Sequence, residues 1–144
     1  MMAVVDTTPG FKFMYRLGGE EEPTIQKLYF KDTETLTKGD LVNVESGTAD
    51  LAATNDAAFL GAAMETKAGT SAVDQIEVIV DDDAVYAVYD ANARSIGDTL
   101  DLSGTTGAQT VTTTSNADFI VVANSTADQL TLVRIKPANH ATHL

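Results

Sequence analysis

The chain has no cysteine and no tryptophan, only three prolines and two histidines, and no long uninterrupted apolar run. Without cysteine it can form no disulfide and carries no thiol nucleophile, which is typical of proteins that fold in a reducing cytoplasm. No segment approaches the roughly 20 apolar residues of a membrane-spanning helix. Residues 1–6 show neither the cationic region nor the apolar run of a signal peptide. We therefore expect a soluble, non-secreted protein with no membrane partner.

Positive charge is also scarce. Nine Lys and Arg residues stand against 21 Asp and Glu residues, which gives a net charge of −12, and the bases are scattered along the chain. A nucleic-acid-binding protein needs a cationic stripe to displace counterions from phosphates. The sequence therefore predicts no nucleic-acid partner, and we interpret the acidity as a source of solubility.

The 144 residues suit one domain, and a β-rich pattern occurs in it twice. Each copy has a Gly-Asp turn that leads into a strand, then a Phe-led apolar strand, then an Asp-Gln turn into another strand. The turns are Gly39-Asp40 and Gly97-Asp98, and the copies span about 37–80 and 95–135. Two copies are too few for a solenoid. We predict an all-β fold: one compact β-barrel, β-tulip or sandwich over 36–136, built from two similar β units.

Turn signals every eight to twelve residues place the individual strands. The strands predicted in this domain are 41–45, 58–65, 75–80, 84–89, 99–102, 108–114, 118–124 and 130–136. Residues 49–57 could form one helical turn, and Asp81-Asp82-Asp83 reads as the tip of a hairpin. Residues 137–144 are predicted to be a flexible tail.

Residues 1–35 lie outside the repeat and are predicted to form an N-terminal extended arm with a strand over 11–17. Phe11, Phe13 and Tyr15 alternate there with polar residues and should share one face. This face could pack inward as the first strand of the barrel. Alternatively, it could dock on another subunit or partner, because aromatic residues and arginine carry much of the energy of protein interfaces. Phe11, Phe13, Tyr15 and Arg16 are therefore the predicted interface residues.

Two clusters could bind a metal. Asp81-Asp82-Asp83 lacks the alternating oxygens, glycine and final glutamate of a calcium loop, and a strand follows it directly. His140 and His143 lie three residues apart in the predicted tail, without other ligands nearby. We interpret the first cluster as a solvated turn and the second as part of a frayed end, and we predict no metal.

The remaining candidates for catalysis also have simpler interpretations. Glu20, Glu21 and Glu22 lie beside glycine and proline in a polar loop, where nothing raises a carboxyl pKa. The two Gly-Asp turns open no helix and so are not phosphate loops. With the only histidines near the end of the chain and no cysteine, serine, threonine and lysine have no evident base. We predict no catalytic residue, no cofactor and no enzyme activity. Tyr86 and Tyr89 should lie on opposite faces of their strand, and the sequence does not indicate which is exposed.

The run Thr37-Lys38-Gly39-Asp40-Leu41-Val42, the run 59–63, the valine-rich runs 78–80 and 85–88 and the turn 96–98 resemble small capsid decoration proteins of tailed phages. These are also called cement or head-stabilising proteins. The resemblance covers about 36–135. It implies a β-barrel or β-tulip domain, commonly trimeric, that binds the major capsid protein on the outer surface of the head. Such a protein is made in the bacterial cytoplasm and becomes part of the virion.

Two other functions remain open. Small trimeric all-β nucleotide hydrolases such as dUTPases have a similar length, but Arg16, Arg94 and Arg134 lack the glycine-rich surroundings of their motifs. A glycan- or receptor-binding domain of a fibre or surface structure is the second alternative. Sugar sites favour exposed Trp and Tyr, and this chain has no Trp and four Tyr.

Overall fold

The computed structural model describes residues 8–31, 34–53, 56, 58–70, 73–113 and 117–141. The described residues are all-β, and they form no helix that could span a lipid bilayer. The elements are β1 Lys12–Arg16, β2 Ile25–Tyr29, β3 Thr35–Leu36, β4 Leu41–Glu45, β5 Thr48–Leu51, β6 Phe59–Ala62, β7 Lys67–Ala68, β8 Gln75–Ile79, β9 Ala84–Tyr89, β10 Thr99–Ser103, β11 Thr110–Thr113, β12 Phe119–Ser125, β13 Leu130–Ile135 and the 3₁₀ turn η1 Pro137–Asn139. The all-β prediction is confirmed.

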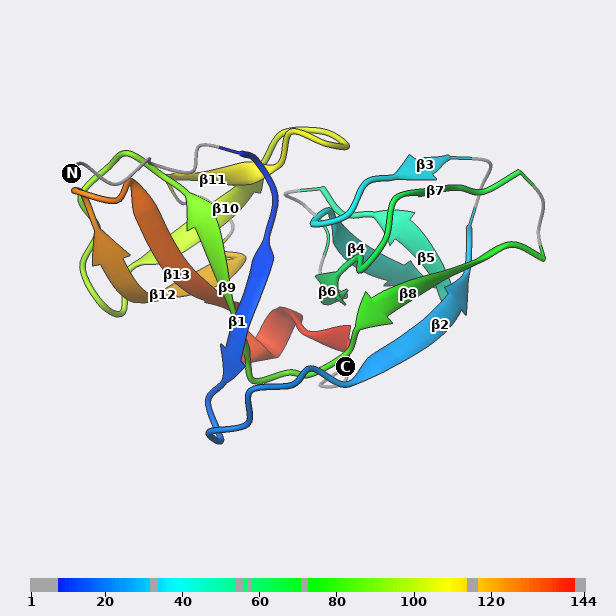
Figure 1. The fold of residues 1–144 in the computed structure, drawn as a ribbon, viewed down its shortest axis with the longest axis horizontal. Helices are drawn as coiled ribbons and strands as arrows, with labels where there is room; N and C mark the ends of the chain where they lie inside the picture. Colours follow the sequence, from blue (N-terminus) through cyan, green and yellow to red (C-terminus); the bar gives the residue numbers. More distant parts are fainter. Residues whose placement is uncertain are drawn as a thin grey trace.

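The strands are arranged in two lobes that lie side by side (Figure 1). One lobe is a six-stranded sheet in the order β1-β9-β13-β12-β10-β11. The other lobe holds a three-stranded sheet, β5-β4-β6, and the strand pairs β2-β8 and β3-β7. The chain passes from one lobe to the other between β1 and β2 and again between β8 and β9.

Among the described residues no sheet closes into a barrel, so the predicted single barrel is not confirmed. The strands are divided between the lobes because β8 pairs with β2, whereas β9 pairs with β1 and β13. In the lobe that holds β2, the ladders are also interrupted. Only the isolated bridge Ala63–Val78 joins β6 to β8, and the isolated bridge Phe30–Ala49 connects the end of β2 with β5.

The two Gly-Asp turns, 37–40 and 95–98, have the same hydrogen bonds. In each, the N–H of the first residue donates to Oδ2 of the aspartate at 2.8 Å, and the aspartate N–H donates back to the carbonyl of the first residue. The third residue is glycine with φ +93° in the first turn and +92° in the second, a conformation that costs other residues energy. Each glycine N–H then donates to the neighbouring strand, at Ala63 O and Val121 O.

The hairpins that follow these turns, β4–β5 and β10–β11, have the same register, with Asn43 opposite Asp50 and Asp101 opposite Thr112. Asn43 Oδ1 accepts the N–H of Ala58, and Asp101 Oδ1 accepts the N–H of Ala117. The hairpins differ in their connections, which are the two residues 46–47 in the first and the six residues 104–109 in the second.

The strand β5 corrects one prediction. Residues 48–51 are paired with β4, so a helical turn over 49–57 is wrong for the part of that range that β5 covers. Ser46 and Gly47 have φ +50° and +79°, as in the type I′ turns that favour tight hairpins. The backbone bonds of 48–51 are therefore used in a sheet and cannot serve a helix.

One further strand pair in each lobe is also alike. β2 runs antiparallel to β8, and β9 runs antiparallel to β13. The N–H of Phe30, just after β2, donates to Asp74 O at 3.1 Å, and the N–H of Asp90, just after β9, donates to Gln129 O at 3.0 Å. Thus β2 and β9 occupy corresponding places in their lobes.

The main apolar core contains residues from both lobes. Leu41, Phe59 and Ile79 from one lobe pack in a single cluster with residues of the other, among them Tyr86 and Phe119. The rings of Phe59 and Phe119 are stacked, with centroids 6.1 Å apart and an interplanar angle of 12°. A second cluster lies within the lobe of β2–β8 and includes Phe30, Leu36, Val42, Leu60 and Ile76. The shared cluster fixes the two lobes relative to each other.

The residues after β13 correct the predicted tail. η1 brings the chain back to the lobe of β6, where His140 is fully buried and forms a bridge with Phe59. His140 Nε2 lies 2.8 Å from the Leu60 carbonyl oxygen, to which it donates. The prediction of a frayed end is therefore wrong for His140, while His143 lies outside the described residues.

Candidate functional site

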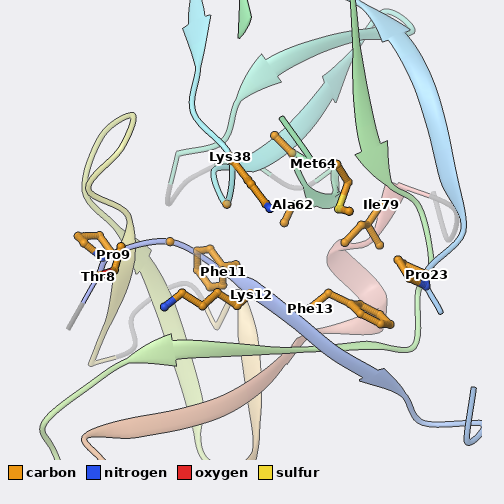
Figure 2. A pocket seen from close by; sticks show the side chains of 13 residues that line it. Thr8, Pro9, Phe11, Lys12, Phe13, Pro23, Lys38, Ala62, Met64 and Ile79 are labelled. Carbon is orange, nitrogen blue, oxygen red and sulfur yellow. The ribbon is translucent and has the colours of Figure 1, made fainter. Parts of the chain in front are cut away.

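An apolar groove of about 490 Å³ opens between β1 and the lobe of β6 and β8 (Figure 2). Phe13 lies on the β1 side, and Met64 and Ile79 lie on the opposite wall. The lining residues are Thr8, Pro9, Gly10, Phe11, Lys12, Phe13, Pro23, Lys38, Gly39, Ala62, Ala63, Met64 and Ile79. The groove is thus built from both lobes and from the segments that join them.

Two glycines form one end of the groove. The N–H of Phe11 donates to Gly39 O at 2.8 Å, which draws the segment before β1 against the turn 37–40. A Cβ on Gly10 would lie 3.4 Å from the Gly39 carbonyl oxygen, and Gly10 has φ +105°. Both the close approach and the positive φ favour glycine at this contact.

One exposed lysine places a positive charge at the groove, although the molecule is acidic. Lys12 and Lys38 are among the lining residues, and no Asp or Glu is. The amine of Lys38 points toward Ala62, whereas Lys12 is the neighbour of Phe13 in β1 and its amine points away from Met64 and Ile79 (Figure 2). The backbone N–H of Lys38 donates to Thr66 Oγ1, so the turn that carries this lysine is held in place. The arrangement suits an apolar group with an anionic neighbour.

The predicted interface residues do not share one face. Phe11 is buried, and its ring meets Tyr86 edge to face with centroids 6.2 Å apart. Phe13 lies opposite Tyr86 in the β1–β9 ladder, whereas Tyr15 lies opposite Val85, because a bulge at Met14 shifts the register. Neighbouring residues of a strand point to opposite faces, so Tyr15 lies on the other side of the sheet. The predicted aromatic face is wrong in this respect.

Arg16 lies among three carboxylates. Its Nε is 2.9 Å from Asp83 Oδ1 and 3.4 Å from Asp81 Oδ1, and its Nη1 is 2.7 Å from Glu20 Oε2. The hydrogen bond to Asp83 is the main cause that raises the pKa of Arg16. These ion pairs hold the end of β1 against the 81–83 segment. The role of Arg16 in an interface stays a prediction, as does that of the three aromatic residues.

Asp81-Asp82-Asp83 is not a hairpin tip, because the strands on either side of it, β8 and β9, are in different sheets. Asp81 is buried, and its Oδ2 accepts the N–H of Thr24 at 2.6 Å. Within the described ranges no three His, Asp or Glu side chains are placed to hold a metal ion. The aspartates instead tie the crossover between the lobes to β1 and to the start of β2.

Of the two tyrosines in β9, Tyr86 is the buried one and Tyr89 is half-buried. The Tyr86 hydroxyl oxygen accepts the N–H of Ala62 at 3.3 Å. Burial raises the pKa of Tyr86 well above its ordinary value. Tyr86 is thus a neutral residue of the core that connects β9 with β6.

Sequence reasoning missed most of the groove. Pro23, Lys38, Met64 and Ile79 come from four separate segments, and no local pattern indicates that they meet. It also missed a buried ion pair for which a signal existed. Asp90 and Arg94 are four residues apart, and Arg94 Nε donates to Asp90 Oδ2 at 2.8 Å.

A scan of protein-family models finds no match to this chain, and no curated protein matches it either.

Proposed function

We propose that this chain is a structural virion protein that decorates the outer surface of a tailed-phage capsid. It stabilises the shell by bridging neighbouring subunits of the major capsid protein, and it acts as a homotrimer without an enzymatic role. The groove between the lobes is the observation that carries the proposal, because a preformed apolar surface beside an edge strand is suited to docking on a protein.

The arrangement of the strands supports a rigid scaffold. We infer that the domain consists of two similar β units, since the turns 37–40 and 95–98 and the hairpins after them share their hydrogen bonds and register. The units pack as a sandwich-like pair on a common core. A rigid scaffold loses little conformational entropy on binding.

The charge and the sequence resemblance support the same function. A protein on the outside of the head does not need to neutralise phosphates, and this chain carries a net charge of −12. As a trimer it would bind through three copies of one modest contact, and such avidity can exceed single-site affinity by about 10²–10⁴. Binding to the closed shell alone would then stabilise the shell by linkage.

The test uses the purified chain and heads of the phage whose genome carries it, prepared without this protein. We expect sedimentation equilibrium to give a trimer and co-sedimentation with the heads to saturate. Cryo-electron microscopy of the saturated heads should place the added density on the outer surface. The bound heads should also withstand higher temperatures before they release DNA.

A monomer that does not co-sediment with the heads would contradict the proposal. Selective binding to a glycan array, together with no binding to heads, would instead support a receptor-binding domain. Hydrolysis of nucleoside triphosphates by the purified chain would support an enzyme. Each result is distinct, so the three functions can be separated with one preparation.

A further inference from the structure

We infer that the groove between the lobes binds an extended segment of a partner protein, one that carries an apolar side chain and a neighbouring acidic side chain. The inference rests on the proposed function, because it names the chemistry by which the capsid protein would be recognised. It goes beyond that function in assigning the contact to the groove lined by Phe13, Met64 and Ile79.

The backbone next to the groove favours an extended partner. β1 is the last strand of the six-stranded sheet, with β9 as its neighbour on one side only. An edge strand can accept a further strand from another chain, and the added main-chain hydrogen bonds contribute affinity. The bulge at Met14 limits this pairing to the part of β1 beside Phe13.

The volume and lining of the groove favour an apolar anchor. About 490 Å³ lies within the roughly 300–1,000 Å³ of pockets that enclose small ligands, so more than one side chain can enter. Met64 presents apolar surface from one wall and Phe13 presents it from the other, while the lining residues Ala62 and Ile79 are already almost fully buried. Burial of an aliphatic or aromatic side chain against this lining would supply the main part of the binding energy.

The charges favour an acidic neighbour. The chain has 21 acidic and 9 basic residues, yet both ionisable residues that line the groove are lysines. The polar hollow on β8 gives a contrast, since Lys27, Lys67, Glu65, Asp74 and Glu77 mix both signs there. The sum of the other charges would repel an acidic partner, and Lys38, which points toward Ala62 (Figure 2), offsets this repulsion at the groove. The groove thus selects where an acidic segment can approach.

The first experiment needs no capsid. The full chain, isotope-labelled, is titrated with a blocked peptide in which leucine and glutamate alternate, and separately with a peptide in which leucine and lysine alternate. We expect saturable changes in the NMR signals of the Met64 methyl group, Phe13 and Lys38 with the acidic peptide only. Equal responses to both peptides, or responses confined to β2 and β8, would overturn the inference.

The second experiment measures binding to heads for Lys38→Glu and the matched control Lys67→Glu. Lys67 is also exposed, but it lies on β7 and lines the other hollow. Exposed charge pairs contribute modestly, so we expect Lys38→Glu to weaken binding about threefold to tenfold and to reduce the dependence of binding on salt. The control should bind like the wild type.

The outcomes separate the inference from the proposed function. Heads that bind both variants as well as the wild type would overturn the groove inference and leave the decoration function standing. Heads that do not bind the wild type would overturn the decoration function, while the peptide titration would still decide the groove. If Lys38→Glu changed the trimer–monomer equilibrium and not head binding, the occupant would be a second copy of this chain, which contradicts the inference.

Discussion

At the scale of single residues, Gly61 in β6 has the least room to change. A Cβ at this position would lie 2.1 Å from the Ile79 carbonyl oxygen and 2.7 Å from the Tyr86 hydroxyl oxygen. Neither atom is at the end of a flexible side chain, since one belongs to the backbone and the other to a buried ring. The contact with Ile79 lies within one lobe and the contact with Tyr86 joins the two lobes, so a change here would disturb both β6–β8 packing and the shared core.

We expect Gly61→Ala to lower the free energy of unfolding by about 2–4 kcal/mol, because the strands must move apart to admit the methyl group. Urea denaturation of the variant and the wild type measures this. Gly18→Ala is the control, since a Cβ there would lie 3.6 Å from Asp83 Oδ2, an ordinary contact. Equal stability of the two variants would show that β6 can shift freely.

Asp90 is a buried residue whose ionisation contributes to the stability of the fold. It is buried, and it accepts hydrogen bonds from Arg94, Thr131 and Asn92. Burial acts to raise the pKa of Asp90, but these hydrogen bonds outweigh burial and lower the pKa below its ordinary value. The charged form is therefore the one that stabilises the folded chain.

The pH dependence follows from this direction. The pKa of an aspartate in an unfolded chain is about 3.9, and that of Asp90 in the folded chain is lower. The stabilisation is thus complete above the unfolded pKa and is lost as pH falls through the folded pKa. We expect Asp90→Asn to cost about 3 kcal/mol at neutral pH, because it leaves the Arg94 charge unpaired, and to flatten the acid side of the stability profile. Denaturant midpoints measured across the acid range for the wild type and Asp90→Asn provide the check. If stability fell with pH equally steeply in both proteins, Asp90 would not be the group responsible.

At the scale of elements, the two Gly-Asp turns are alike in backbone and differ in what their aspartates hold. Asp98 is exposed and caps its own turn. Asp40 is buried and also accepts hydrogen bonds from the Thr106 hydroxyl and the Gly107 N–H, in the loop between β10 and β11. One turn therefore stabilises a hairpin, and the other also joins the lobes.

This difference predicts unequal effects of the same substitution. Asp98→Ala should cost about 1 kcal/mol, the value of one hydrogen bond that water can partly replace. Asp40→Ala should cost more, about 2–3 kcal/mol, because it removes a buried acceptor of hydrogen bonds from the 104–109 loop in addition to the bond within its own turn. Thermal and urea denaturation of Asp40→Ala and Asp98→Ala would measure the two losses of stability. Similar losses would mean that the loop is held by other contacts.

The individual strands also show which parts of the fold could be predicted from the sequence. The eight strands predicted between 41 and 136 are present, because turn signals and apolar runs mark them locally. β5 was missed although the Ser46-Gly47 pair is a hairpin signal, since the alanine-rich residues after it suggested a helix. The bulge at Met14 has no such signal, and it reversed the face of Tyr15. His140 was misread because its partner, Leu60, is 80 residues away.

The alignment of the two sequence copies shows what an apolar repeat pattern cannot determine. Val42 and Leu100 each lie three residues after the turn glycine, and their partners are Gly61 and Phe119. The sequence pattern aligned Phe119 with Phe59 instead, which lies two residues before Gly61. A shift of two keeps every side chain on its face, so an apolar pattern of period two cannot detect it. The groove could not be predicted for a related reason, since its walls meet only once the lobes have packed.

At the scale of the whole molecule, the lobes should fold as one unit, because they share the core around Phe59 and Phe119. Gln109 adds polar contacts across the boundary. It is fully buried, its Oε1 accepts the N–H of Leu41, and its Nε2 donates to Ala52 O at 3.0 Å. The buried polar groups of β4 and of the residue after β5 thus depend on a side chain from the other lobe.

We expect one cooperative unfolding transition, with the slowest amide hydrogens of β4 and β13 exchanging at the same free energy. Gln109→Ala should cost about 3 kcal/mol and should separate these two free energies, because it leaves buried groups of one lobe unsatisfied. Thr112→Ala is the control, because Thr112 is an exposed residue of β11. Different exchange free energies in the wild type would mean that the lobes unfold independently.

The unequal lengths of the hairpin connections bear on stoichiometry. Two related units could in principle offer a partner two equal binding places per chain. The six-residue connection 104–109 extends to the other unit, where the Gly107 N–H donates to Asp40 Oδ1. The corresponding connection of the first unit is only the two-residue turn 46–47 and forms no such extension. The pairing of the units is thus one-sided, and it builds the groove lined by Phe13, Met64 and Ile79 once in each chain. A saturated assembly should accordingly hold one partner segment for each chain, which is three for each copy of the trimer proposed above.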